Sequence, residues 1–271
     1  MSYPSITIFR DLALKAGEAI LEVYTSDVFG TVTKSDNSPV TRADQAADAI
    51  ITAGLRDAYP HIALVTEEQA DTHDQTVQDF LIVDPLDGTK EFIQKRDEFT
   101  VNIAYVQNGV PVMGVVYAPA LGRMFYADET GAYEETGPFE IGQIGARTTL
   151  RVAQAQEDAP IQVVASKSHM DPTTERYIRL YNVAQTTSAG SSLKFCLIAS
   201  GAAHLYPRCA PTMEWDTAAG DAVLRAAGGQ MVHFPQMTPF TYGKAGFRNT
   251  YFIAAGQIDL KNDVEPVTER N

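Results

Sequence analysis

The chain has 271 residues, of which 45% are hydrophobic and 9% aromatic, with 34 acidic residues against 21 basic ones. This composition excludes a disordered chain and allows one large or two modest globular domains. The net charge of −13 disfavours a general nucleic-acid or anionic-membrane surface, because affinity there depends on clustered Lys and Arg. An anionic substrate would need metal ions or a few local bases to overcome the negative field.

The sequence shows no segment of the kind that enters a membrane. It has no run of about 18 apolar residues, and residues 1–4 lack the basic and then apolar regions of a signal peptide. We therefore expect no transmembrane segment and a cytoplasmic location, with peripheral attachment at the inner membrane as the alternative. In a reducing compartment, Cys196 and Cys209, which lie in apolar stretches, are expected to be buried thiols rather than a disulfide.

The first part of the chain predicts two amphipathic helices with a polar loop between them. Apolar residues recur at spacings of three and four over residues 5–23, and residues 32–40 are rich in turn formers. The second helix begins after Thr41, a good N-cap, and ends before Pro60. Asp44 lies in its first turn, where a carboxylate suits the helix dipole, so by itself Asp44 needs no functional role.

Two predicted buried strands, residues 62–65 and 80–83, are each followed by carboxylates. Glu67 and Glu68 follow the first strand, and Asp84 follows the second. Parallel or neighbouring strands would bring these ends together, and ligands often bind at such strand ends. Paired glutamates are also common as solvated surface residues, so both interpretations stay open here.

Residues 84–89 form a bend, because a proline and a glycine within them turn the backbone out of the sheet. Asp84 and Asp87, with the carbonyl of Leu86 between them, offer the oxygen ligands that Mg²⁺ prefers, and the hydroxyl of Thr89 could hold a metal-bound water. A solvated turn is the alternative interpretation, since Asp, Pro and Gly are ordinary turn residues.

The remaining predicted elements divide the chain near residue 149. Asn108-Gly109 lies between two strands, 99–107 and 110–117, and predicts an antiparallel hairpin. We expect an N-terminal α+β subdomain over residues 1–148, with an antiparallel sheet and the metal-binding motifs, and a C-terminal α/β subdomain over residues 149–271. The later elements are a strand at 161–165, helices at 171–181 and 193–199, a strand at 203–206 and a helix ending at 227.

Two stretches of the second half offer candidate site residues. Gly190, two serines and Lys194 begin an apolar helix whose free N–H groups could bind a phosphate; a plain Ser N-cap with Lys194 in solvent is the alternative. Asp216 begins a helix rich in small residues, which would let that helix approach another backbone closely. Asp216 could hold a cation or act only as an N-cap.

Together these blocks resemble the inositol monophosphatase family of Mg²⁺-dependent, lithium-sensitive phosphatases. The resemblance covers roughly residues 10–255 and lies in residues 64–68, 84–89 and 215–220. Within the family, the chain is similar to the CysQ-type 3′(2′),5′-bisphosphate nucleotidases at residues 34–41, 89–92, 99–104, 190–196 and 205–208. It departs from the pattern at Arg42, where a smaller residue is expected, and in a short spacer between Glu67 and Asp84.

The resemblance implies a layered α/β/α/β/α sandwich and a two- or three-ion Mg²⁺ site. It implies that Thr89 hydrogen-bonds the attacking water while Asp44 accepts its proton, without a covalent phosphoenzyme. The implied metal ligands are Glu67, Asp84, the Leu86 carbonyl, Asp87 and Asp216. The implied substrate contacts are Gly88, Thr89, Ser166, His169, Ser191, Lys194, Arg208 and Asp216; a lone histidine such as His169 is more often a structural hydrogen-bonder.

The resulting expectation is an enzyme that removes the 3′-phosphate of adenosine 3′,5′-bisphosphate, giving AMP and phosphate, and serves sulfur metabolism. The sulfated analogue, 3′-phosphoadenylyl sulfate, is a second expected substrate. The expected partner is thus a small bisphosphate nucleotide rather than a nucleic acid polymer, and the enzyme is expected as a monomer or homodimer. The alternatives are an inositol or sugar monophosphatase on the same scaffold and a non-catalytic nucleotide-binding protein.

Overall fold

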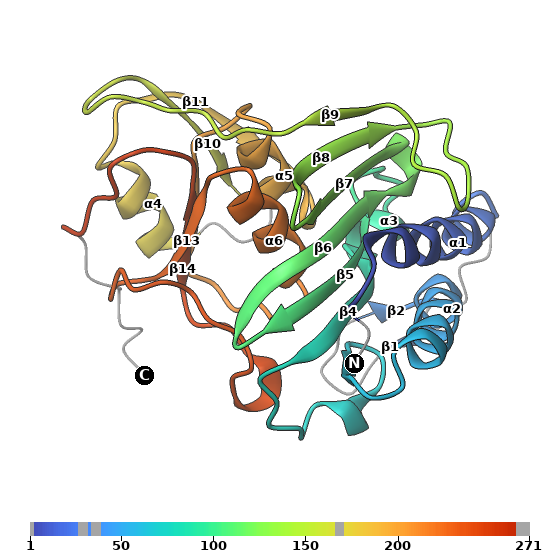
Figure 1. Cartoon of the computed structure of the whole chain (residues 1–271). Helices are drawn as coiled ribbons and strands as arrows, with labels where there is room; N and C mark the ends of the chain where they lie inside the picture. Colours follow the sequence, from blue (N-terminus) through green and yellow to red (C-terminus); the bar gives the residue numbers. More distant parts are fainter. Residues whose placement is uncertain (1–2, 27–31, 34–38, 166–170, 264–271) are drawn as a thin grey trace.

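Two β-sheets and the helices packed on them arrange the chain in five layers (Figure 1). The computed structural model describes residues 3–26, 32–33, 39–165 and 171–263. From one side to the other, the layers are α1 (Ile6–Tyr24) with α2 (Arg42–Ala58), a seven-stranded sheet, α5 (Leu193–Ala199) with α6 (Ala218–Ala226), a five-stranded sheet, and α4 (Pro172–Ile178). The predicted α/β/α/β/α sandwich is therefore confirmed.

The larger sheet is antiparallel except at one edge, where its first two strands run parallel. Both Asn108 and Gly109 have positive φ angles, 50° and 73°, as the predicted hairpin turn requires. The strand order follows the chain: β3 (Ala63–Thr66), β4 (Phe80–Asp87), β5 (Thr100–Gln107), β6 (Val110–Ala118), β7 (Arg123–Asp128), β8 (Gly131–Thr136) and β9 (Arg147–Thr149). The division at residue 149 stays a prediction.

The smaller sheet has the order β11-β10-β12-β14-β13. Its strand β10 lies parallel to both neighbours, and β14 lies antiparallel to both of its own. The sequence analysis placed one strand two residues early, at 203–206, and missed three of them. The strands are β10 (Ile161–Ala165), β11 (Val183–Ser188), β12 (Leu205–Arg208), β13 (Gln230–His233) and β14 (Phe252–Ala255).

Shorter elements complete the fold. The predicted loop at 32–40 contains two paired strands, β1 (Val32–Thr33) and β2 (Pro39–Val40), while 34–38 lie outside the described residues. A short helix that the sequence analysis did not predict, α3 (Thr89–Ile93), follows β4. The 3₁₀ turns are η1 (Ala70–Thr72), η2 (Pro119–Leu121) and η3 (Ala245–Phe247).

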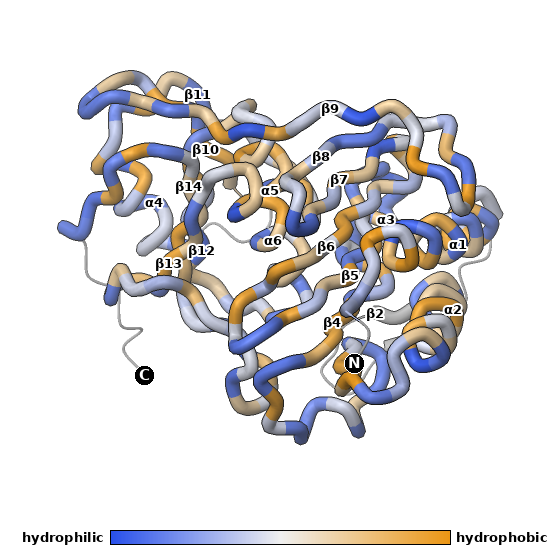
Figure 2. Tube along the Cα trace, in the orientation of Figure 1, coloured by the Kyte–Doolittle hydropathy of each residue, from blue (hydrophilic) through white to orange (hydrophobic). Residues whose placement is uncertain are grey.

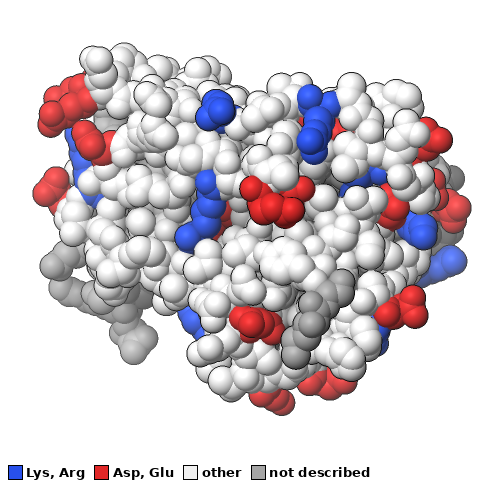
Figure 3. Space-filling view, in the orientation of Figure 1, with Lys and Arg blue, Asp and Glu red and all other residues white. Residues whose placement is uncertain are grey.

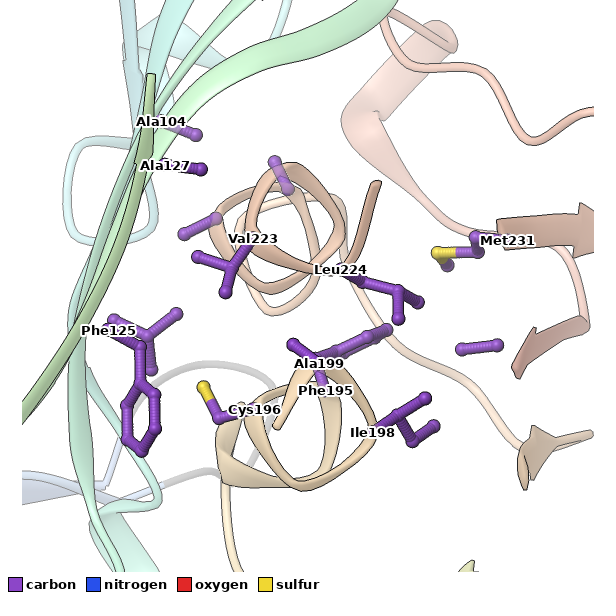
Figure 4. Packing of buried hydrophobic residues seen from close by; sticks show 14 of the residues in the cluster. Ala104, Phe125, Ala127, Phe195, Cys196, Ile198, Ala199, Val223, Leu224 and Met231 are labelled. Atoms are coloured by element: carbon purple, nitrogen blue, oxygen red, sulfur yellow. The ribbon is translucent and has the colours of Figure 1, made fainter. Parts of the chain in front are cut away.

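Three apolar clusters fill the spaces between the layers. Along β5, the alternation of strand side chains sends Val101 and Ile103 toward α1 and α2, and Ala104 toward α5 and α6. Figure 4 shows Phe125 facing α5 and α6 across the middle cluster, and Figure 2 shows apolar residues both along the strands and on the helices. Both cysteines are buried and free, as predicted, Cys196 in this middle cluster and Cys209 in the outer one.

The basic side chains do not form a cluster on the face of the protein seen in Figure 3. On the face seen in Figure 3, basic side chains stand apart from one another, separated by uncharged atoms and by acidic groups. Of the helices in the described part of the chain, none has the length and apolar character needed to cross a bilayer.

Small residues let α6 lie very close to the larger sheet, as the sequence predicted. A Cβ atom on Gly114 of β6 would lie 2.9 Å from both the Cα and the carbonyl oxygen of Ala219, and 3.0 Å from the Cβ of Ala222. Such a distance leaves no room for even one methyl group. This contact determines how closely α6 approaches the sheet. It therefore also determines the position of the turn before α6, which carries Asp216.

We expect Gly114→Ala to lower the free energy of unfolding by about 1–3 kcal/mol, because the added methyl group meets backbone rather than a movable side chain. Urea unfolding measures the change. The matched control is Val110→Ala at the exposed start of the same strand, which should change stability by less than about 0.5 kcal/mol. Equal stability of Gly114→Ala and wild type would show that α6 can move away without cost.

Candidate active site

The ends of β3 and β4 meet at one edge of the larger sheet, as predicted. These strands are parallel, with Thr66 opposite Val83, and the backbone N–H of Glu67 donates to the Val83 carbonyl at 3.1 Å. Glu67 therefore leaves its strand beside Asp84, which follows Val83 directly and has only 1% of its surface exposed. The parallel pairing brings together two carboxylates that lie 17 positions apart in the chain.

The bend after Asp84 differs in detail from the prediction, because β4 continues to Asp87. The pairing of β4 with β5 is irregular between Asp84 and Asp87, and the N–H of Leu86 donates to Asp84 Oδ1 at 3.0 Å. Gly88 then has a φ of +93°, a region that favours glycine, and α3 begins at the next residue. This backbone path presents the Leu86 carbonyl and the Asp87 carboxylate at the sheet edge.

Asp44 contributes to the cap of α2 and also contacts Thr89 at the site, so the two roles that the sequence left open are compatible. Asp44 Oδ2 accepts from the backbone N–H and the hydroxyl of Thr41, at 2.7 and 2.6 Å, which forms a capping box at the start of α2. Asp44 Oδ1 accepts from the Thr89 hydroxyl at 3.1 Å. Burial raises the pKa of Asp44, and the hydrogen bonds from Thr41 and Thr89 oppose that rise.

Ser192 joins the two halves of the chain at this site. Its hydroxyl lies 2.7 Å from the Asp216 carbonyl and 3.2 Å from Asp87 Oδ2, and it accepts from Asn102 Nδ2 at 3.0 Å. The alternative of a plain Ser N-cap is wrong for Ser192, because its side chain makes no cap hydrogen bond. The sequence analysis named no site residue in β5; an asparagine within an apolar strand was the available signal for Asn102, which the structure shows to be buried.

The loop before α5 packs directly on the bend after β4. The Ser191 hydroxyl lies 2.8 Å from the Asp87 carbonyl, and a Cβ on Gly88 would lie only 2.4 Å from Ser191 Oγ. Ser191 itself has a φ of +48°, which is unusual for a residue with a side chain. A side chain at residue 88 would therefore displace the Ser191 hydroxyl from its position beside the Asp87 carbonyl.

Lys194 is buried, with 6% of its surface exposed, so the alternative that places it in solvent is wrong. Its Nζ donates to the carbonyls of Ser191 and Ala189 at 2.6 and 3.2 Å, which holds the preceding loop in place. Desolvation lowers the pKa of Lys194 to about 8, although the nearby charge of Asp87 acts in the opposite direction.

Asp216 and Arg208 complete the group of predicted residues that the structure describes. Asp216 Oδ2 accepts from the backbone N–H of Met213 at 2.8 Å, upstream of α6, and the N-cap of that helix is Thr217. The N-cap interpretation of Asp216 is therefore wrong. Arg208 donates to the carbonyls of Ala210 and Pro211 at 3.4 and 3.1 Å. Two further predicted substrate contacts, Ser166 and His169, lie outside the described residues.

The carboxylates at the site repel one another. Desolvation and the charges of Glu67, Asp87 and Asp216 hold the pKa of Asp84 well above its usual range. Desolvation and the charge of Asp87 raise the pKa of Asp216 in the same way. Desolvation also raises the pKa of Asp87 to about 6, although Lys194 opposes the rise. Among the described residues, Asp84 forms no ion pair with Lys or Arg.

The donor set fits Mg²⁺. All the predicted ligands offer oxygen atoms, and a cation would relieve the repulsion that raises the pKa of Asp84. Within the described ranges, no three His, Cys, Asp or Glu side chains already surround a single point. Mg²⁺ does not need such a cage, because it usually keeps several waters and uses one or two carboxylates together with substrate phosphates.

We expect Mg²⁺ to raise the melting temperature more at about pH 7.5 than at about pH 5. The pKa of Asp87 rises from 3.8 to about 6 on folding, so between these values the folded chain holds a proton that the unfolded chain releases. Without metal, the protonated Asp87 therefore stabilises the fold at low pH, and this stabilisation is lost as the pH rises from 3.8 to about 6. Mg²⁺ requires the ionised form, and at 100 times its dissociation constant adds about 2.7 kcal/mol.

Thermal unfolding at several pH values, with and without Mg²⁺, measures this effect. Asp87→Asn should show a smaller Mg²⁺-induced rise in the melting temperature and a flatter pH dependence without metal. A rise of the same size in both proteins would show that Asp87 does not contact the ion.

Comparison with known proteins identifies the family. The model of the inositol monophosphatase family matches residues 3–259. The 3′(2′),5′-bisphosphate nucleotidase CysQ of Escherichia coli K12 is 47% identical over 234 residues, which cover 85% of this chain and 91% of that protein. The crystal structure of CysQ from Bacteroides thetaiotaomicron, 40% identical, superposes with a TM-score of 0.80 over 94% of this chain and 97% of its own. The IMPase of Thermotoga maritima, 24% identical with a TM-score of 0.72 over 91% and 90% of the two chains, shares the fold. The chain therefore belongs to the inositol monophosphatase family.

Proposed function

We propose that the protein is a 3′(2′),5′-bisphosphate nucleotidase, which hydrolyses the 3′-phosphate of adenosine 3′,5′-bisphosphate to give AMP and phosphate. The observation that carries the proposal is the group of mutually repelling carboxylates beside the Asp44–Thr89 hydrogen bond. The choice of substrate rests on the relatives named CysQ, which match most of this chain. 3′-Phosphoadenylyl sulfate, which carries the same 3′-phosphate, is the second substrate we propose.

We assign proton transfer to Asp44 and Thr89. The Thr89 hydroxyl, 3.1 Å from Asp44 Oδ1, can accept a hydrogen bond from the attacking water while it donates to Asp44. The proton of the water then passes to Asp44, whose carboxylate is fixed by the two hydrogen bonds from Thr41. Because the raised pKa of Asp44 brings it closer to neutral pH, burial makes this carboxylate a better base.

We assign metal binding to Glu67, Asp84, Asp87, Asp216 and the Leu86 carbonyl, with two or three Mg²⁺ ions. Phosphatases of this family are generally Mg²⁺-dependent. Bound Mg²⁺ would lower the pKa of the attacking water and stabilise the charge that develops on the departing ribose oxygen. The protein's part is to hold the ligands on a sheet edge, with Asp84 anchored through its hydrogen bond to the Leu86 N–H.

We assign the rest of the nucleotide to the loop before α5 and to Arg208. Two cations interact with the carboxylates of the site. The charge of Lys194 opposes the rise in the pKa of Asp87, and the charge of Arg208 opposes the rise in the pKa of Asp216. These two cations are the local bases that an anionic substrate needs on a chain of net charge −13. The proposed substrate contacts are Gly88, Thr89, Ser166, His169, Ser191, Lys194, Arg208 and Asp216.

Turnover of adenosine 3′,5′-bisphosphate and inositol 1-phosphate under equal Mg²⁺ tests the assignment. We expect the nucleotide to have the higher kcat/KM. A preference for the inositol ester would replace the proposal by an inositol monophosphatase on the same scaffold, and tight nucleotide binding without turnover would indicate a non-catalytic binding protein.

Asp87→Asn should lower kcat/KM by at least about 10²-fold while leaving the fold intact, because the change weakens metal binding without changing side-chain size. Steady-state kinetics with circular dichroism as a check on folding measures this. The matched control is Asp57→Asn on the exposed face of α2, which should keep wild-type activity. Normal turnover by Asp87→Asn would remove Asp87 from the site.

Lys194→Ala should raise the KM for adenosine 3′,5′-bisphosphate more than the KM for a simple phosphate ester, because the lost contact is with a group that does not react. Lys15→Ala, on the exposed side of α1, is the control and should change neither value. An equal loss on both substrates would assign Lys194 only to the support of the Ser191 loop that it holds in this structure.

A further inference from the structure

One imidazole connects the two segments that carry Glu67 and Asp216. The ring of His73 stacks on the ring of Trp215, with centroids 4.7 Å apart and an angle of 29° between the planes. Its Nε2 lies 2.8 Å from the carbonyl oxygen of Thr66, and since a carbonyl only accepts, Nε2 carries the proton that is donated. Thr66 directly precedes Glu67, and Trp215 directly precedes Asp216.

The segment that carries His73 is itself held firmly. Asp48 of α2, which is buried, accepts from the Thr66 hydroxyl at 2.6 Å and from Gln69 Nε2 at 2.7 Å. The Thr72 hydroxyl donates to the Gln69 carbonyl at 2.7 Å, and the Thr66 N–H donates back to that hydroxyl at 3.2 Å. The turn from Thr66 to His73 is thus a closed hydrogen-bonded unit, and its histidine cannot move without disturbing the end of β3.

The segment that carries Trp215 is also held by hydrogen bonds. Trp215 has 6% of its surface exposed, and its neighbour Glu214 receives hydrogen bonds from the N–H groups of Gly243 and Lys244 at 2.7 and 3.0 Å. Asn249 Nδ2 donates to the Met213 carbonyl at 2.7 Å. Since both rings belong to fixed segments, their stack sets a distance between those segments.

We propose that His73 is a positioning residue that fixes Glu67 relative to Asp216 and thereby raises the affinity for Mg²⁺. This inference rests on the metal site of the proposed function and adds a residue outside the predicted ligand set. Glu67 follows β3 and Asp216 precedes α6, and the two carboxylates repel each other, since the charge of Glu67 raises the pKa of Asp216. In the absence of a contact that holds the two segments together, the repulsion favours their separation.

Three substitutions separate the two contacts. His73→Gln keeps a hydrogen-bond donor and removes the stack, His73→Phe keeps a stacking ring and removes the donor, and His73→Ala removes both. We expect His73→Ala to raise the Mg²⁺ dissociation constant about tenfold, as for other residues that orient metal ligands, and the other two variants to lie between it and wild type. At saturating Mg²⁺, kcat should stay within about threefold of wild type, since no group that touches the substrate is lost.

Isothermal titration of the substrate-free protein with Mg²⁺ measures the dissociation constant without recourse to activity. Because Trp215 is the single tryptophan of the chain, its fluorescence reports the stack directly, and the emission of His73→Ala and His73→Gln should shift to longer wavelength. The control is His61→Ala, an exposed histidine in the turn before β3, which should match wild type in both measurements.

An unchanged Mg²⁺ dissociation constant in His73→Ala, with a wild type that binds Mg²⁺ and hydrolyses the nucleotide, would overturn this inference and leave the proposed function intact. A wild type that neither binds Mg²⁺ nor hydrolyses the nucleotide would overturn both. If His73→Ala does not fold, the same criterion applies to His73→Gln and His73→Phe.

Discussion

Repulsion among carboxylates at one buried sheet edge is the constraint on which the rest of this structure depends. Two buried carboxylates elsewhere in the core each have a cation in direct contact: Glu135 lies 2.6 Å from Arg10, and Glu214 lies 2.6 Å from Lys244. Asp84 instead faces three other carboxylates, and its pKa is raised by desolvation and by their charges. An arrangement so unfavourable for an isolated chain is understandable where a divalent cation binds.

The polar contacts around the site serve to keep these groups in place against that repulsion. Ser192 connects the Asp216 carbonyl with the Asp87 carboxylate, and Asn102 from the middle of the sheet supports both Ser192 and Asp87. Lys194 holds the loop that contains Ser191. Because these contacts come from both halves of the chain, the site exists only when the two halves are packed together.

Packing sets the distance across which the halves meet. The small residues on one face of α6 and the glycine in β6 let the helix lie against the sheet with no side chain between them. Asp216 is held in the turn before this helix, where the Met213 N–H fixes its carboxylate. A bulkier contact would move the whole turn away from the carboxylates at the ends of β3 and β4, so an apolar contact remote from the chemistry controls its geometry.

The sequence by itself determined the features that depend on neighbours in the chain. The two N-terminal helices, the Asn108-Gly109 hairpin and the bend at residues 84–89 follow from periodicity, turn chemistry and capping, all of which act over a few residues. The family resemblance added the order of layers, which the structure confirms. Short strands were missed where local signals are weak: β11 is mostly exposed and polar, so it lacks the apolar run that marks a buried strand.

Only the tertiary structure decided the partners of the polar side chains. Ser192 and Asp87, which are joined by a hydrogen bond, lie 105 positions apart, and whether Lys194 is buried or solvated depends on elements that close around it. The stack of His73 on Trp215 joins two segments that share no motif. A hydroxyl, an ammonium or an imidazole can be satisfied by many partners, so the residue type alone does not select them, whereas the packed structure places particular partners within hydrogen-bonding distance.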